Sequence, residues 1–173
     1  LSVAADNLTG SGNVATYSGF GLYVQYCGDA SSYNGVKFKI SGDVGDSGNV
    51  LFYVQTNVGK WADGSKGTCF APKANEFSDC VYPSVPITGV TSVPQEVTIL
   101  WTDVGNGKPA AAATTDGSDV IGFQWAFDWM VGTPAYDASL SIDDMELVGD
   151  GAGTGGADGA GGNANSGGAG GAL

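Results

Sequence analysis

Residues 120–130 read VIGFQWAFDWM, and this stretch decides the fold. Large apolar side chains at Ile121, Phe123, Trp125 and Phe127 alternate with smaller or polar ones. Successive side chains of a β-strand point to opposite faces, so a period of two predicts a strand with one row in a core.

The same alternation recurs along most of the chain, between turns rich in Gly, Asp, Asn and Pro. Further strands are predicted over residues 20–26, 36–41, 50–56, 96–102 and 138–147, with weaker candidates at 14–17 and 84–87. Only a short stretch at residues 109–113 has helical character, whereas α/β folds need crossover helices. The sequence therefore predicts an all-β fold, an antiparallel two-sheet β-sandwich of the jelly-roll type, over residues 1–150.

Residues 151–173 read GAGTGGADGAGGNANSGGAGGAL, which is mostly Gly and Ala. With no aromatic or β-branched apolar side chain, this segment has nothing to bury in a core. We predict a disordered linker or tail. Such a tether suggests a further domain or an attachment point in a parent protein.

The charge and the missing histidines exclude several classes of function. The chain has 18 acidic residues, 6 basic ones and no His, for a net charge of −12. Nucleic acid is not expected as a partner, because phosphate binding needs clustered Lys or Arg. Without His, Ser-His-Asp and Cys-His chemistry are excluded. No apolar run reaches the roughly 18 residues of a membrane-spanning helix, so membrane insertion is not expected.

The predicted strands carry a second, amphipathic row of side chains. In residues 50–56, Phe52 and Val54 face the core and alternate with Tyr53 and Gln55. In the same way Phe20, Leu22 and Val24 are predicted to face the core, as are Trp101 and Trp125. If the strands share a sheet, the opposite rows combine into one face that carries Tyr23, Gln25, Tyr53, Gln55, Gln124 and Asp128.

A face that mixes aromatic rings, amides and a carboxylate suits a polysaccharide. Sugar C–H patches stack on aromatic rings, and sugar hydroxyls pair with amide and carboxylate groups. Small residues at Gly122 and Ala126 are expected to leave a trough for the chain. Trp61, in a loop, and Trp129, at a strand end, are further candidate ligand-binding residues.

Three cysteines accompany an acidic surface rich in Asn, Ser and Thr, which fits a secreted, extracellular or cell-surface protein. The expected disulfide joins Cys69 to Cys80 across a short loop and contributes about 3 kcal/mol through loop closure. Cys27 is then left single. Three reduced thiols are the alternative.

Five pieces of the sequence carry a resemblance to a known family: GFGLYVQYCGDASSYNGVKFKISG, VLFYVQT, VTILWTD, IGFQWAF and LSIDDMELV. On these pieces the chain resembles the galactose-binding-like jelly-roll domains of bacterial extracellular carbohydrate-binding modules. The resemblance implies a jelly roll that binds polysaccharide or oligosaccharide. Its Ile-Asp-Asp piece implies a structural calcium with Asp143 as a ligand, and Asp6 is available as a partner. No other cofactor is expected.

Two other functions compete with a non-catalytic carbohydrate-binding module. A glycoside hydrolase or lyase needs two suitably spaced carboxylates. Glu76, Glu96 and Glu146 all lie away from the predicted sugar face, which leaves Asp128 with Asp103 or Asp119. A structural or adhesive surface protein that assembles through strand edges or filaments is the other alternative.

Overall fold

The computed structural model describes residues 2–4, 7–56, 81–107, 114–132 and 134–149. In this part of the chain it contains nine strands and a 3-10 turn at Trp101–Asp103. The strands are β1 (Ser2–Ala4), β2 (Asn7–Val14), β3 (Gly19–Gly28), β4 (Gly35–Asp43), β5 (Val50–Thr56), β6 (Ser84–Ile87), β7 (Gln95–Leu100), β8 (Val120–Phe127) and β9 (Tyr136–Val148).

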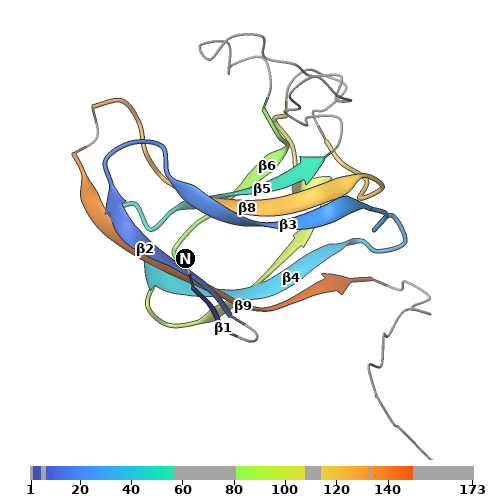
Figure 1. Cartoon of the computed structure of the whole chain (residues 1–173), viewed down its shortest axis with the longest axis horizontal. Helices are drawn as coiled ribbons and strands as arrows, with labels where there is room; N and C mark the ends of the chain where they lie inside the picture. The colour runs from blue at the N-terminus through green and yellow to red at the C-terminus, as the bar shows by residue number, and fades with distance from the viewer. Residues whose placement is uncertain (1, 5–6, 57–80, 108–113, 133, 150–173) are drawn as a thin grey trace, which may run out of the picture.

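The strands form two sheets that face each other (Figure 1). One sheet has the order β1-β2-β9-β4-β7 and the other the order β3-β8-β5-β6. Every pairing is antiparallel, and the chain passes repeatedly from one sheet to the other. This arrangement is a jelly-roll β-sandwich, so the predicted fold class is confirmed. Among the described residues no helix is long and apolar enough to cross a membrane.

The core between the sheets is built around three aromatic rings. Phe38 comes from the five-stranded sheet, whereas Phe52 and Trp125 come from the four-stranded sheet. Each of the three ring pairs has a centroid separation of 5.4 Å, and all three side chains are fully buried. The rings therefore join the two sheets at the centre of the sandwich.

The observed strands mostly match the predicted ones. β5 and β6 have the predicted bounds, but β1 and most of β2 were not predicted. The strand expected over residues 96–102 ends at Leu100, because Asp103 accepts the Leu100 backbone N–H at 3.0 Å and turns the chain. Trp101 is buried as predicted and donates its indole N–H to the Tyr33 carbonyl at 2.8 Å.

In the predicted strand over residues 20–26, the core position predicted for Leu22 was wrong. Leu22 was expected in the core, but 37% of its surface is exposed. Leu22 pairs in regular register with Phe123, but β3 is the edge strand of its sheet, so the Leu22 side chain has neighbouring strands on one side only. Phe20, on the same row, still packs against the core.

Candidate functional site

The predicted face lies on the outside of the four-stranded sheet, where β3, β8 and β5 run side by side. In one row across these strands Tyr23 pairs with Gly122, and Gly122 pairs with Gln55. In the next row Gln124 lies between Gly21 and Tyr53. Because Phe52 and Trp125 point into the core, their neighbours along the strands point outward. The structure thus brings four of the predicted side chains together.

Hydrogen bonds connect these side chains into a tyrosine–glutamine cluster, whose members are Tyr17, Tyr23, Tyr53, Gln55 and Gln124. The amide nitrogen of Gln55 donates to Gln124 Oε1 at 2.8 Å and to the Tyr23 hydroxyl at 3.3 Å. The amide nitrogen of Gln124 donates to the Tyr17 hydroxyl at 3.0 Å. Tyr17 and Tyr53 are hydrogen-bonded through their hydroxyls. The cluster is therefore a continuous polar network across three strands and the turn before β3.

Tyr17 is the member that the sequence did not point to. It was placed in a weak strand candidate, but it lies in the turn between β2 and β3. Ser18, the next residue, donates its hydroxyl to the Thr16 carbonyl, and its own carbonyl accepts the Phe127 backbone N–H. These bonds hold the turn against β8. The one signal in the sequence was an aromatic ring two residues before Gly19, where β3 begins.

Gly122 forms the floor of the cluster. A Cβ at this position would lie 2.5 Å from the Leu22 carbonyl oxygen, 3.1 Å from Gln55 Oε1 and 3.2 Å from Tyr23 Cδ1. The missing side chain at Gly122 thus lets the Gln55 amide and the Tyr23 ring lie over the strand. The trough expected at this point is therefore occupied by Gln55 and Tyr23. Ala126, its other expected floor residue, is 1% exposed.

Burial differs sharply within the cluster. Gln55 is only 4% exposed, whereas the Tyr23 and Tyr17 side chains are 68% and 53% exposed. Gln55 Oε1 is buried and has no hydrogen-bond partner among the described residues. The cluster therefore consists of exposed rings around a buried amide.

The phenols of Tyr17 and Tyr53 are held in their neutral form. Burial raises the pKa of Tyr17 far above its ordinary value, and the neighbouring Tyr53 raises it further. The Tyr17 hydroxyl is hydrogen-bonded to Gln124 and Tyr53, although 53% of the Tyr17 surface is exposed. Burial also raises the pKa of Tyr53. Near neutral pH these hydroxyls therefore act as hydrogen-bond donors and acceptors and carry no charge.

Two other predicted ligand-binding residues, Asp128 and Trp129, do not join the cluster. Asp128 follows β8, accepts the Tyr136 hydroxyl at its carbonyl oxygen at 2.6 Å, and lines a cavity with the turn between β4 and β5. Trp129 packs against the core, and its indole N–H is buried without a partner among the described residues. Trp61 and the side chain of Gln25 lie outside the part of the chain that the structure describes.

The predicted disulfide also falls outside this part. Cys69 and Cys80 are not among the described residues, and neither is the side chain of Cys27. The Cys69–Cys80 bridge therefore stays a prediction.

The Ile-Asp-Asp piece near the end of the domain forms a β-bulge. Between Lys37 and Lys39 the pairing of β4 with β9 shifts by one residue, and Asp144 adopts a positive φ of 49°. Asp143 Oδ1 accepts the Asp144 N–H at 2.9 Å, and Lys39 binds the Asp144 carboxylate at 2.5 Å.

These contacts leave the calcium site predicted at Asp143 untested. Both carboxylates are engaged by protein groups, one of them by the Lys39 ammonium. Among the described residues no group of three or more His, Cys, Asp or Glu side chains is placed to hold a metal ion. Asp6 lies outside the described residues, so the calcium ion predicted at Asp143 stays untested.

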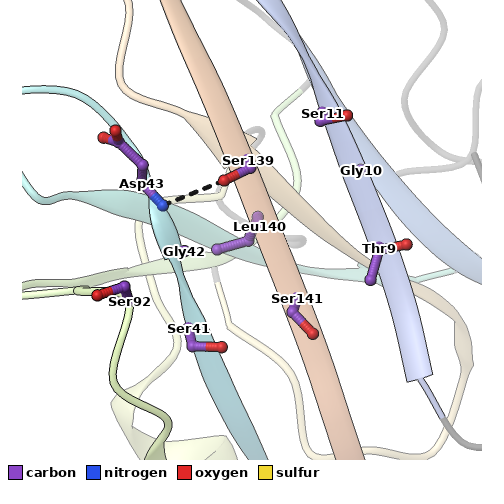
Figure 2. Close-up of a pocket in the computed structure, with 10 residues that line it drawn as sticks. All are labelled: Thr9, Gly10, Ser11, Ser41, Gly42, Asp43, Ser92, Ser139, Leu140 and Ser141. Atoms are coloured by element: carbon purple, nitrogen blue, oxygen red, sulfur yellow. Dashed lines mark hydrogen bonds between the residues drawn. The ribbon is translucent and has the colours of Figure 1, made fainter.

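A second surface lies on the outer face of the other sheet. Ala138, Leu140 and Ile142 of β9 are buried, so the intervening Ser139 and Ser141 point outward. Together with side chains of β2 and β4 they line a groove of about 640 Å³, which we name the serine groove (Figure 2). Its polar lining residues are Thr9, Ser11, Ser41, Asp43, Ser92, Ser139 and Ser141.

Two hydroxyl groups of the serine groove form hydrogen bonds to other protein groups. Ser139 Oγ accepts the Asp43 backbone N–H at 3.4 Å (Figure 2), and Ser141 Oγ donates to the Asn7 side-chain oxygen at 3.0 Å. Among the residues that the structure describes, no aromatic ring lines the groove. It therefore lacks the stacking surface that the tyrosine–glutamine cluster offers.

Comparison with known proteins identifies the fold. No protein-family model matches the sequence, and no curated protein matches it significantly. A solved family 11 carbohydrate-binding module of the cellulosomal cellulase Lic26A-Cel5E of Clostridium thermocellum superposes with a TM-score of 0.50 and 11% identity, over 85% of this chain and 89% of that one. A family 11 module from the same organism, in complex with a β-1,3-1,4-mixed-linked tetrasaccharide, gives a TM-score of 0.48 and 12% identity, over 82% of this chain and 88% of that one. The chain has the jelly-roll β-sandwich fold found in family 11 carbohydrate-binding modules.

Proposed function

We propose that this chain is a non-catalytic carbohydrate-binding module that holds a polysaccharide against the outer face of the β3-β8-β5 strands. The observation that carries the proposal is the tyrosine–glutamine cluster. It offers two strongly exposed rings, Tyr17 and Tyr23, beside two amides that are held in place by hydrogen bonds. Rings of this kind stack on sugar C–H patches, and the hydroxyls and amides around them pair with sugar oxygens.

The charge of the cluster favours a neutral sugar chain. Its five members carry no formal charge, and the whole protein has a net charge of −12. Lys37 and Lys39 lie on the other sheet and are paired with acidic side chains. The net charge of −12 repels a polyanionic glycan but not an uncharged one.

The described carboxylates support binding without catalysis. Glycoside hydrolysis normally uses two carboxylates on either side of the scissile bond. The cluster itself contains none, and both Glu96 and Glu146 contact Lys37 on the five-stranded sheet. Asp128 lies beside Tyr136, against the turn between β4 and β5. The likeness of fold to a carbohydrate-binding module is consistent with the same interpretation.

A secreted or cell-surface location completes the proposal. Polysaccharides of cell walls and matrices lie outside the cell, and the acidic chain with its Gly- and Ala-rich residues 151–173 suits a tethered extracellular module.

Affinity electrophoresis tests the proposed function. The protein is run through gels that contain mixed-linkage β-glucan, xylan, mannan, galactan or the anionic polysaccharide pectin, and reducing ends are measured in parallel. We expect retardation by at least one neutral polysaccharide, none by pectin, and no release of reducing ends.

Two variants identify the face that binds. Gln124→Ala, in the cluster, should reduce retardation, and Ser141→Ala, in the serine groove, should leave it unchanged. If Ser141→Ala alone abolishes retardation, the proposed face is wrong. A structural or adhesive function replaces this one if no polysaccharide retards the protein and the protein assembles instead. Assembly is detected by early elution in size-exclusion chromatography and by filaments in microscopy.

A further inference from the structure

Gln55 is the buried centre of the tyrosine–glutamine cluster. Its amide nitrogen uses both hydrogens, one toward Gln124 Oε1 at 2.8 Å and one toward the Tyr23 hydroxyl at 3.3 Å. Its oxygen is buried without a hydrogen-bond partner among the described residues. Gln55 thus acts as a donor in two directions.

The opposite orientation of this amide is less favourable. If the Gln55 oxygen accepted hydrogen bonds from Gln124 and Tyr23, the amide nitrogen would take the buried position of Oε1. Two N–H donors would then lack partners, instead of one acceptor. Buried polar groups without partners destabilise a protein, and two unpaired donors cost more than one unpaired oxygen. Burial at Gln55 therefore selects the observed direction.

The orientation of the Gln55 amide also determines which groups donate and which accept in the rest of the network. Because Gln124 accepts at Oε1, its nitrogen must point the other way, toward the Tyr17 hydroxyl at 3.0 Å. A hydroxyl that accepts a hydrogen bond becomes a stronger donor, so Tyr17 donates to Tyr53. The pKa values agree: the Tyr17–Tyr53 hydrogen bond raises that of Tyr17 and, against the larger effect of burial, lowers that of Tyr53.

The two terminal hydroxyls then each keep a hydrogen. Tyr23 accepts from Gln55 and Tyr53 accepts from Tyr17, and neither hydroxyl donates to another member of the cluster. Tyr23, with 68% of its surface exposed, offers its hydrogen to the solvent side.

We propose that Gln55 is a positioning residue that fixes the direction of hydrogen bonding, so that Tyr23 and Tyr53 meet the glycan as donors. The site then selects sugar positions whose oxygens accept hydrogen bonds, such as ring and glycosidic oxygens. This inference rests on the proposed carbohydrate function, but the direction of the network can be tested without a ligand.

Two substitutions reverse different parts of the network. Gln55→Glu replaces the double donor by a carboxylate that only accepts, which turns Gln124, Tyr17 and both terminal hydroxyls around. In Gln124→Glu the carboxylate still accepts a hydrogen bond from the Gln55 amide, but it also accepts one from the Tyr17 hydroxyl. Tyr17 then accepts from Tyr53, so only the Tyr17–Tyr53 hydrogen bond changes direction. Gln95→Glu, on β7 of the other sheet, adds the same charge as a control.

Binding is measured by isothermal titration with the neutral polysaccharide that retards the wild type most. At about pH 8 we expect Gln55→Glu to bind at least tenfold more weakly and Gln124→Glu about three- to tenfold more weakly, since a reversed hydrogen bond costs about that factor. Gln95→Glu should bind like the wild type. Equal affinities for all three variants would overturn the proposal.

The pH dependence separates direction from mere packing. Burial raises the pKa of a carboxyl group, and a protonated Glu at position 55 has one O–H to donate. Affinity of Gln55→Glu should therefore recover at about pH 5 relative to about pH 8, while Gln55→Leu stays equally weak at both. The titratable groups in the described network around position 55 are tyrosines, and burial raises the pKa of both Tyr17 and Tyr53, so wild-type affinity should stay flat over this range.

Stability must be followed in the same samples. A folded-state carboxyl whose pKa is raised stabilises the fold less as the pH rises, so Gln55→Glu also unfolds more readily at the higher pH. Circular dichroism shows whether the protein remains folded during titration. Failure of the folded variant to recover at low pH would refute the positioning role.

A double substitution provides a second test if Gln55→Glu does not fold. Tyr53→Phe should weaken binding when it is made in the wild type. In the Gln124→Glu background it should add no further loss, because there the Tyr53 hydroxyl already donates to Tyr17 and not to the glycan. Additive losses would contradict the proposed direction.

Hydrogen exchange tests the network in the free protein. In ¹H–¹⁵N spectra both side-chain amide hydrogens of Gln55 should exchange far more slowly than those of Gln95, also in Gln124→Glu. If the Gln55 amide exchanges as fast as Gln95, the direction is wrong, whatever the protein binds. If the Gln55 amide is protected but no polysaccharide binds, the network stands and the carbohydrate function fails.

Discussion

Phe52 and Tyr53 are neighbours in the chain but occupy opposite environments. Phe52 is fully buried and lies 5.4 Å from the rings of both Phe38 and Trp125, measured between centroids. Tyr53 lies on the outer face and shares a hydrogen bond with Tyr17. One residue along a strand thus separates the core from the proposed binding face.

Substitutions at these two positions should have opposite effects. Phe52→Ala should destabilise the domain by roughly 3–5 kcal/mol, because it opens a cavity among the three central rings. Tyr53→Ala should leave the fold intact and weaken polysaccharide binding by about 1–2 kcal/mol through the lost ring contact and hydroxyl. Urea denaturation and isothermal titration measure the two effects. A Tyr53→Ala protein that melts early while Phe52→Ala does not would mean that the two faces of β5 are exchanged.

Gly122 is a second position where a small substitution should affect both stability and binding. Gly122→Ala places a Cβ 2.5 Å from the Leu22 carbonyl oxygen and close to Gln55 Oε1. We expect a loss of about 1–3 kcal/mol in unfolding free energy, because β3 and β8 must move apart, together with weaker polysaccharide binding. Gly12→Ala is the matched control, since no atom lies within 4 Å of a Cβ there. Equal melting temperatures for both variants would show that the cluster tolerates a wider floor.

Alternation along the strands could predict which side chains share the face but not how they interact. Tyr23, Tyr53, Gln55 and Gln124 lie together because the period of two holds wherever the ladders are regular. Tyr17 was missed because a turn, not a strand, presents it. The burial of Gln55 was also missed, since an amide on an amphipathic row is ordinarily exposed, and it depends on Gly122 beneath it.

Among the elements, β9 is a long strand that contains a β-bulge. Its thirteen residues pair with β2 on one side and with β4 on the other, and the bulge at Asp144 interrupts only the pairing with β4. Asp tolerates a positive φ better than most residues do, because its short side chain bonds to nearby backbone. The sequence piece that resembles a calcium site is therefore also the sequence that a bulge requires.

The bulge predicts how substitutions at Asp144 behave. Asp144→Val should destabilise the protein by about 1–3 kcal/mol, since a β-branched residue strongly resists a positive φ. Asp144→Gly removes the same ion pair with Lys39 but accepts the backbone conformation, and exposed ion pairs contribute little. Thermal unfolding of both variants separates backbone strain from charge. Equal destabilisation would assign the effect to the lost carboxylate.

Predicted and observed elements agree best where propensity and pattern coincide. β5 and β8 are rich in β-branched and aromatic residues, and their positions could be read from the sequence. β2, with the sequence NLTGSGNV, was largely missed because Gly, Ser and Asn disfavour strands. Its pairing with both β1 and β9 holds it in the sheet, and that pairing is a tertiary effect.

At the scale of the whole molecule, the jelly roll could be predicted because core rows recur at regular spacing and crossover helices are lacking. The order of the strands could not, since it depends on long-range pairing such as that of β2 with β9. The same limit applies to the site, because the neighbourhood of β3, β8 and β5 follows only from this order.

The low-complexity end of the chain gives a prediction at this scale. Deleting residues 151–173 should leave the melting temperature unchanged, because apart from the final Leu the segment has no apolar side chain larger than Ala, and β9 ends at Val148. Thermal unfolding of the shortened and full chains measures this. A drop of more than a few degrees would show that the segment packs on the sandwich.

The pairing of β2 with β9 also has a mechanical consequence. These strands are antiparallel, and Asn7, where β2 begins, lies opposite Asp143, close to the end of β9 at Val148. A pulling force that enters the domain before β2 and leaves it after β9 therefore acts at one end of the ladder. Its residue pairs, from Asn7–Asp143 to Val14–Tyr136, would separate one after another rather than all at once. Under tension β2 should peel away from the sheet at low force, while the four-stranded sheet that carries Gln55 and its tyrosines is still intact.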